Sequence, residues 1–271
     1  MTTDVRELDG AWNFRDVADA TTIAPGWLFR SGELSELAEA GRTELRRLGI
    51  TDVADLRSPR EVERRGAGRV PDGVHIHLLP FPDLADDHGG NDESPHEHAF
   101  RRLMTERPDA ESIADTAARY MTEEYRRFPT LPGARRAVHR VITLLGAGHR
   151  VLAHCFAGKD RTGLTIAVVL EAVGIDRDAI MADYLRSNDA VPQLRSKILE
   201  MISERAGAGV TPEVVTFSEA RLTDEVLGVR ADYLDTARRA IDDNYGSMAG
   251  FLRAAEVTRT DLDRLRSALL G

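Results

Sequence analysis

The stretch that most constrains the fold runs from Val151 to Gly163 and reads VLAHCFAGKDRTG. It opens with a short apolar run that predicts a buried strand, and it leads into an apolar helical segment from Leu164 to Val173. Gly174, a usual residue at the end of a helix, follows that segment. The stretch therefore predicts a strand, a tight loop and a helix, with the single cysteine of the chain, Cys155, at the end of the strand.

A loop that opens a helix is suited to hold a tetrahedral oxyanion. The first N–H groups of the helix have no partner within it, and the aligned peptide dipoles place about half a positive charge at the same point. A cysteine there is held as a thiolate, which makes Cys155 a candidate nucleophile. Arg161 lies six positions later and can offer two parallel N–H donors to a dianion, as a lysine cannot. The spacing predicts a phosphate cradle with a sulfur at its base.

The pattern His154-Cys-x-x-Gly-Lys-Asp-Arg-Thr-Gly163 resembles the signature loop of the cysteine-dependent phosphatases, and more narrowly that of the mycobacterial type B family of bacterial tyrosine and lipid phosphatases. Three further stretches agree with that family: Asn13-Phe14-Arg15-Asp16, Asp55-Leu56-Arg57-Ser58 and Tyr245-Gly246-Ser247. The alternative for a lone cysteine is a small buried side chain, but the residues around Cys155 favour the nucleophile.

The resemblance implies a phosphatase of broad specificity, which acts on phosphotyrosine and also on phosphoserine, phosphothreonine and phosphoinositides. It also implies a helical lid over the active site. We expect no metal and no organic cofactor, and phosphorylated proteins or phosphoinositides as the partners. Two other functions stay open as alternatives: a non-catalytic module that recognises phosphate, and a sulfur transferase of the rhodanese type.

Composition limits the classes of partner and of compartment. The chain has 271 residues and a net charge of −9, which argues against generic binding of nucleic acid through a basic surface. One cysteine excludes an internal disulfide framework. The first ten residues are polar, and no run of about 18 apolar residues occurs, so we expect a cytoplasmic protein without a transmembrane segment. The resemblance raises export by a route that needs no signal peptide.

Strands that alternate with helices predict an α/β fold with a mainly parallel central sheet flanked by helices. The expected strands are 27–31, 50–56, 74–79 and the run before Cys155, and a helix is expected from Leu34 to Leu48. Ligands bind beyond the carboxyl ends of such strands. Arg57, Ser58 and Arg60 follow the second strand, and Asp83 follows the third.

The second half of the chain is helical by pattern. The expected helices are 113–128, 133–145, 164–173, 176–186, 193–205, 230–242, 247–253 and a last one that starts from Thr260 as its N-cap. We expect one phosphatase domain over residues 1–271, with the core in about 1–190 and a C-terminal helical lid or subdomain in about 191–271. Residues 211–228 are apolar and follow Gly207 and Gly209, so we predict that they shield Cys155, although ordinary helix packing would fit as well.

The segment from Asp83 to Ser112 is rich in acidic residues, glycine and proline, which predicts a loop. His88, His96 and His98 lie in it beside carboxylates. A metal site is the alternative there, but the segment lacks the fixed ligand spacing that structural zinc sites use. We therefore interpret it as a solvated loop.

The predicted reaction begins when the Cys155 thiolate attacks a phosphate monoester and forms a phosphocysteine, which water then hydrolyses. The negative charge would be held by the Arg161 guanidinium and by the backbone N–H groups of the loop. The phosphate-binding residues are predicted to be Phe156, Ala157, Gly158, Lys159, Asp160 and Arg161.

The leaving oxygen needs a proton, and two acids are candidates to supply it. Asp160 lies within the cradle, and Asp83 lies on a separate loop. We favour Asp160 as the donor and give Asp83 a secondary or orienting role. The alternative for Asp160 is a hydrogen bond that anchors the loop backbone.

Several neighbours are given supporting roles. Lys159 adds a second cation that suits substrates with more than one phosphate, unless it faces solvent. His154 is predicted to hydrogen-bond to the loop, not to act as a base. Ser58 and Arg60 are candidates for a wall of the substrate site. Asn13, Arg15 and Asp16 are expected to brace the N-terminal turn.

Overall fold

The computed structural model describes residues 8–81, 112–206 and 222–271. Its central sheet has five strands in the order β1-β2-β5-β3-β4. All neighbouring strands are parallel except the short β1, which runs antiparallel to β2. The bounds of the strands are β1 Arg15–Asp16, β2 Leu28–Ser31, β3 Asp52–Asp55, β4 His75–Leu78 and β5 Val151–His154. The α/β fold with a mainly parallel sheet is confirmed.

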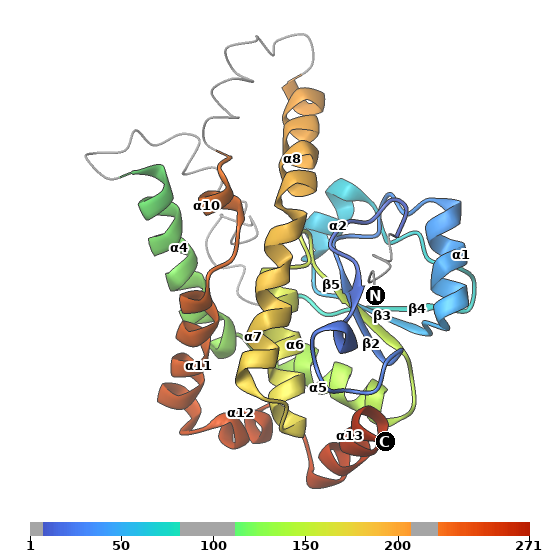
Figure 1. Cartoon of the computed structure of the whole chain (residues 1–271), viewed down its shortest axis with the longest axis vertical. Helices are drawn as coiled ribbons and strands as arrows, with labels where there is room; N and C mark the ends of the chain where they lie inside the picture. Colours follow the sequence, from blue (N-terminus) through green and yellow to red (C-terminus); the bar gives the residue numbers. More distant parts are fainter. Residues whose placement is uncertain (1–7, 82–111, 207–221) are drawn as a thin grey trace.

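Helices surround this sheet, and the chain is wholly helical after β5 in its described part (Figure 1). The α-helices are α1 Glu39–Leu48, α2 Pro59–Arg65, α4 Ile113–Arg127, α5 Pro132–Gly146, α6 Asp160–Val173, α7 Arg177–Leu185, α8 Val191–Ala206, α10 Asp224–Leu227, α11 Ala231–Tyr245, α12 Met248–Ala254 and α13 Arg259–Leu270. Short 3-10 helices occupy Val17–Asp19, Phe128–Thr130 and Arg186–Ala190. In this part of the chain no helix is long and apolar enough to cross a membrane.

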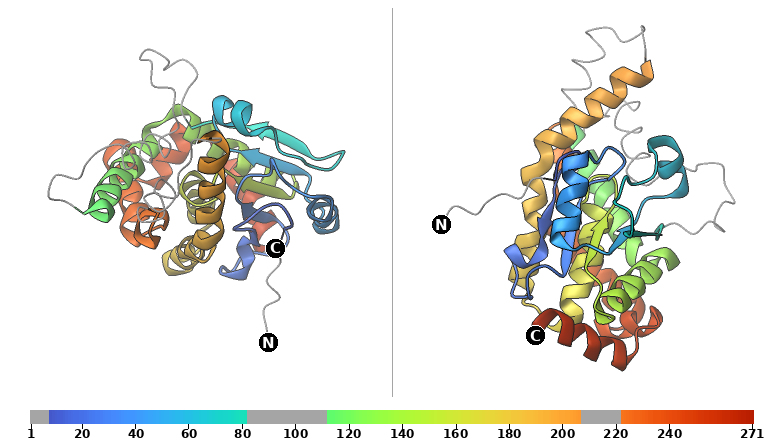
Figure 2. Two further views of the ribbon diagram at one scale, coloured as in Figure 1. Left: turned by 90° about the horizontal axis from the view of Figure 1, so that it is seen from above. Right: turned by 90° about the vertical axis from the view of Figure 1, so that its right-hand side faces the viewer.

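The two faces of the sheet carry separate apolar layers because successive side chains of a strand point to opposite faces. Val151 and Ala153 of β5 belong to the large core under the helices from α4 onward, whereas Leu152 belongs to a smaller core. That smaller core includes Leu45 and Leu48 of α1. Figure 2 shows the same division, with α1 on one side of the sheet and the C-terminal helices on the other.

Helix α6 begins at Asp160, before the predicted start at Leu164. Two further predicted helix starts were wrong, and each has a local cause. The helix expected from Leu34 begins only at Glu39, because Ala38 is extended and its N–H donates to the Asp9 carbonyl oxygen. The N-cap of α13 is Thr258, not Thr260. The Thr258 hydroxyl accepts from the Asp261 N–H, and the Asp261 carboxylate accepts from the Thr258 N–H, which forms a capping box.

Candidate active site

The predicted cradle lies where the sequence places it, between the end of β5 and the first turn of α6. Cys155 is buried at the carboxyl end of the central strand, with 2% of its surface exposed. Gly158 has a positive φ of 68°, and a Cβ atom there would lie 2.1 Å from the carbonyl oxygen of Ser31. Only glycine fits this position, because the loop turns against β2 without room for a side chain.

Two side chains hold the outer carbonyl groups of the cradle. Asn13 Nδ2 donates to the carbonyl oxygens of Ala157 and Gly158, at 3.1 and 3.0 Å. Arg30 Nη2 donates to the same Gly158 oxygen at 2.7 Å. In a trans peptide the C=O and the following N–H point in opposite directions. Carbonyls that face these donors therefore leave the N–H groups of Gly158 and Lys159 aimed at the other side of the loop, where an anion would sit.

One of these donors, Arg30, is itself fixed by a buried carboxylate on α7. Asp183 accepts from Arg30 Nη1 at 2.6 Å and from Arg15 Nε at 2.8 Å. Burial alone would raise the pKa of Asp183, but the two arginines outweigh it and hold the pKa below its usual value. Burial and the charge of Arg30 lower the pKa of Arg15 to about 10. Asn13, which we predicted to brace the N-terminal turn, thus contacts the catalytic loop. Arg15 donates within the turn to Asn13 Oδ1 at 2.6 Å, and Asp16 Oδ1 accepts from the Ala18 N–H at 3.0 Å.

Arg161 is oriented by a residue that the sequence reading did not include. Its Nη1 and Nη2 atoms donate to the two carboxylate oxygens of Glu61, at 2.7 and 2.8 Å, and Nη1 also donates to the Leu56 carbonyl oxygen at 3.1 Å. Burial by itself would lower the pKa of Arg161. The charge and hydrogen bonds of Glu61, and after them the charge of Cys155, outweigh burial, so the pKa is raised.

Glu61 is positioned by the start of α2. The Ser58 hydroxyl accepts from the Glu61 N–H, and the Glu61 carboxylate accepts from the Ser58 N–H at 2.7 Å. Ser58 therefore caps the helix that carries the partner of Arg161, and Arg60 lies exposed on the same helix. A Ser-x-x-Glu pattern is a known capping signal, so this pair was readable in the sequence.

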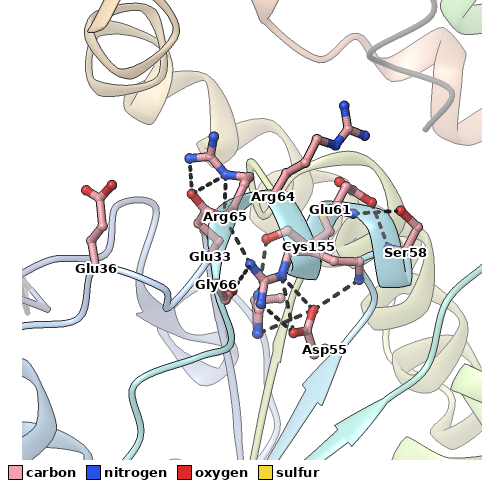
Figure 3. A network of polar contacts seen from close by, with 12 residues as sticks. Glu33, Glu36, Asp55, Ser58, Glu61, Arg64, Arg65, Gly66 and Cys155 are labelled. Carbon is pink, nitrogen blue, oxygen red and sulfur yellow. Dashed lines mark hydrogen bonds and ion pairs between the residues drawn. The ribbon is translucent and has the colours of Figure 1, made fainter. Parts of the chain in front are cut away.

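Further buried charges lie beneath this pair. Arg57 donates to Asp55 and to Glu33, and Glu33 also accepts from Arg65 (Figure 3). His154 lies against the same group, with Nε2 at 3.7 Å from Asp55 Oδ1. Its Nδ1 lies 3.1 Å from the carbonyl oxygen of Cys155, an acceptor, so Nδ1 carries the proton.

Burial is the largest influence on His154 and lowers its pKa, which favours the neutral ring. A neutral His154 that donates to the carbonyl oxygen of Cys155 agrees with the predicted hydrogen bond to the loop.

Besides Arg161, the cradle holds two charged residues, Lys159 and Asp160, which contact different elements. Asp160 Oδ1 accepts from the Tyr125 hydroxyl of α4 at 3.0 Å, and Oδ2 lies 3.8 Å from Lys159 Nζ. Lys159 Nζ donates to the carbonyl oxygens of Leu227 and Gly228 at the end of α10, so its ammonium does not face solvent.

An apolar cover lies over the loop. Phe156 and Ala157 form one buried cluster with residues of α8 and of the segment around α10: Val191, Leu194, Leu222 and Leu227. The ring of Phe156 also contacts Trp12 edge-on, at 5.9 Å between centroids, and lies 4.5 Å from the Arg65 guanidinium. In Figure 1, α8 rises between α2 and α10.

Some predicted residues lie outside the described part of the chain: Asp83, His88, His96, His98 and residues 211–221. The described residues hold no group of three or more histidine, cysteine, aspartate or glutamate side chains that could bind a metal ion.

Sequence comparisons agree on one family. The model of the tyrosine phosphatase family matches residues 6–271. The chain is 64% identical to the triple specificity protein phosphatase PtpB of Mycobacterium tuberculosis, over 98% of this chain and 99% of that protein. It is 34% identical to a Cupriavidus necator protein provisionally named a tyrosine-protein phosphatase, over 94% and 82% of the two chains. A tyrosine-protein phosphatase of Nostoc commune is 24% identical, over 92% of this chain and 76% of its own.

Proposed function

The chain belongs to the tyrosine phosphatase family and is a cysteine-dependent phosphatase, and we propose that it hydrolyses phosphotyrosine, phosphoserine, phosphothreonine and phosphoinositide monoesters. The name of the relative at 64% identity, a triple specificity protein phosphatase, supports more than one class of substrate. The observation that carries the proposal is the cradle itself, in which Cys155 and Arg161 share one loop whose outer carbonyls are tied back by Asn13 and Arg30.

In the first step the Cys155 sulfur attacks phosphorus in line with the leaving oxygen. The charge that develops on the phosphoryl oxygens is met by the loop N–H groups and by Arg161, whose guanidinium needs no reorganisation because Glu61 already holds it. Water hydrolyses the phosphocysteine in the second step and frees the thiolate.

Asp160 is proposed to protonate the leaving oxygen, and Asp83 to orient the substrate. Asp160 lies in the first turn of α6, inside the cradle, and its carboxylate is buried against Tyr125. Asp160→Asn and Asp83→Asn are to be assayed on aryl phosphates with good and poor leaving groups. The variant that removes the proton donor loses roughly 100-fold or more on the poor leaving group and far less on the good one. Equal losses on both would remove that variant's residue from the role.

Lys159 is proposed to contact a second phosphate of an inositol lipid. Its ammonium is held by the Leu227 and Gly228 carbonyls, so a second phosphate would have to replace these acceptors. Lys159→Met is expected to lower kcat/KM on a bisphosphorylated inositol lipid more than on a phosphotyrosine peptide. An equal loss on both substrates would reduce Lys159 to general support of the loop.

The described part of the cover, α8 and α10, is proposed to shield Cys155 from water and oxidants, which its 2% exposure supports. The compartment stays a prediction from the sequence: a cytoplasmic protein, with release by a route that needs no signal peptide raised by the resemblance.

A further inference from the structure

Two buried tyrosines form a hydrogen-bonded chain that ends on Asp160. The Tyr184 hydroxyl of α7 donates to the Tyr125 hydroxyl at 2.7 Å, and the Tyr125 hydroxyl of α4 donates to Asp160 Oδ1 at 3.0 Å. Tyr125 is fully buried, and Tyr184 is 1% exposed. The rings of Tyr125 and Tyr184 meet edge-on at 6.3 Å, and Tyr233 of α11 stacks on Tyr125 at 5.4 Å.

The direction of the chain follows from the donors that each group owns. A phenol has one O–H to donate, so once Tyr184 has given its hydrogen to the Tyr125 oxygen, the Tyr125 hydrogen is left for Asp160. Burial is the main cause that raises the pKa of both phenols well above the usual value, so both stay protonated at working pH. Because Tyr184 lies in the core, the chain does not deliver protons from solvent.

A glycine of the signature loop makes the arrangement possible. A Cβ atom on Gly163 would lie 2.8 Å from Cδ2 and 2.9 Å from Cε2 of the Tyr184 ring. Atoms at that distance overlap, so any larger residue at position 163 would push the ring away. The glycine that ends the motif therefore lets Tyr184 approach α6 and reach Tyr125.

We propose that Tyr125, supported by Tyr184, is a positioning residue that reserves Asp160 Oδ1 as an acceptor and leaves Oδ2 to carry the acid proton. This inference rests on the proposed function, in which Asp160 is the proton donor. An oxygen that already accepts a phenol hydrogen is the poorer site for the proton of a neutral carboxylic acid, because the carbonyl oxygen of such an acid is a stronger acceptor than its hydroxyl oxygen. The opposite oxygen, on the side of Lys159, then holds the proton.

The Cys155 thiolate forms the S–P bond, the bond from phosphorus to the leaving oxygen breaks, and that oxygen keeps its electron pair. The proton on Asp160 Oδ2 moves to the leaving oxygen, so the alcohol or phenol departs neutral and Asp160 becomes a carboxylate. In the second step the attacking water gives a proton back to Oδ2.

The test compares Tyr125→Phe and Tyr184→Phe with Tyr233→Phe, which removes a hydroxyl from the same aromatic cluster without touching the chain to Asp160. Each variant is assayed on a series of aryl phosphates whose leaving groups differ in acidity, with Asp160→Asn as the reference. Tyr125→Phe is expected to lower kcat about tenfold on the poorest leaving group and less than about twofold on the best, with KM unchanged. Tyr184→Phe gives a smaller loss with the same dependence, and Tyr233→Phe gives none.

The outcomes separate the inference from the function on which it rests. If Asp160→Asn shows no dependence on the leaving group, the assignment of Asp160 as donor fails, and the inference fails with it. If Asp160→Asn shows the dependence but Tyr125→Phe behaves as Tyr233→Phe does, Asp160 stays the donor and the inference is overturned. If Tyr125→Phe lowers kcat equally on all substrates, the inference is also overturned, because a change in packing alone would explain a loss that does not depend on the leaving group. If Tyr125→Phe does not fold, the dependence of kcat on the leaving group is measured in Tyr184→Phe instead.

Discussion

Glu61 decides how Arg161 presents its guanidinium to a phosphate. Both Nη atoms of the arginine are bound by this one carboxylate, and both partners are almost completely buried. A buried charge that loses its partner is strongly disfavoured, so the position of the arginine depends on the acid. The capping box at Ser58 fixes the acid in turn. The charge that stabilises the transition state is thus set by the local structure of α2.

Glu61→Gln should lower kcat by about tenfold or more, because the amide can accept from only one Nη atom and no longer balances the guanidinium charge. The matched control is Glu63→Gln, on an exposed position of the same helix, which should leave kcat unchanged. Steady-state kinetics with one aryl phosphate measure both. A Glu61→Gln enzyme as active as the control would show that Arg161 keeps its position without this carboxylate.

Asp183 makes the stability of the fold sensitive to acid. Its folded pKa lies below the ordinary value of 3.8, because Arg30 and Arg15 outweigh burial. The stabilisation is therefore fully present above about pH 4 and is lost as the pH falls through the lower folded pKa. Asp183→Asn should lower the free energy of unfolding by about 3–5 kcal/mol at pH 7, since two buried arginines lose their counter-charge.

The Asp183 prediction is checked by urea unfolding at several pH values. The free energy lost by Asp183→Asn relative to wild type should shrink below about pH 4, where wild type loses the same charge. Asp178→Asn, at an exposed position of α7, is the control and should cost little. A difference between Asp183→Asn and wild type that stays constant from pH 7 to pH 3 would contradict the account.

At the scale of elements, the sequence predicted what local spacing encodes. The strand, loop and helix around Cys155, the parallel sheet and the C-cap at Gly174 all follow from short patterns, and all are present. Pairings between distant buried charges leave no such pattern. Arg30 meets Asp183 across 153 positions, and neither residue stands in a motif. The start of α1 was missed for the same reason, because the hydrogen bond from Ala38 to Asp9 keeps the chain extended up to position 38 and delays the helix.

The cover made by α8 and α10 should control access to Cys155. Leu194 and Leu227 are 4% and 5% exposed and pack in the cluster with Phe156. Truncating one such leucine to alanine costs about 2 kcal/mol or more, which corresponds to roughly 30-fold in an opening equilibrium. Leu194→Ala should therefore accelerate alkylation of Cys155 by iodoacetamide by at least about tenfold. Leu270→Ala, at a residue 47% exposed, is the control. Equal alkylation rates would mean that the cover does not gate the thiol.

At the scale of the whole molecule, we propose that the chain folds as one domain. One apolar core contains residues from Val17 to Leu269, so the last three helices, α11, α12 and α13, pack with the sheet in the same cluster. The N–H of Ala24 also donates to the carbonyl oxygen of Leu269 in α13. These C-terminal helices are thus part of the core. The boundary between the core and the C-terminal helical part is therefore less sharp than the expected division at about residue 190.

The two tryptophans can test this unity. Trp12 contacts Phe156 at the cradle, and Trp27 packs against the main core near α13. In variants that keep only one tryptophan, the urea midpoints followed by fluorescence should coincide with each other and with that of circular dichroism. Midpoints that separate would show two units that unfold independently.

The most direct test of the central claim is capture of the covalent intermediate. Enzyme mixed with an aryl phosphate is quenched with acid within one turnover, digested and analysed by mass spectrometry. A phosphoryl group on the peptide that contains Cys155, together with loss of turnover in Cys155→Ser, is the predicted result. Phosphate on another residue, or full hydrolysis by Cys155→Ser, would contradict it.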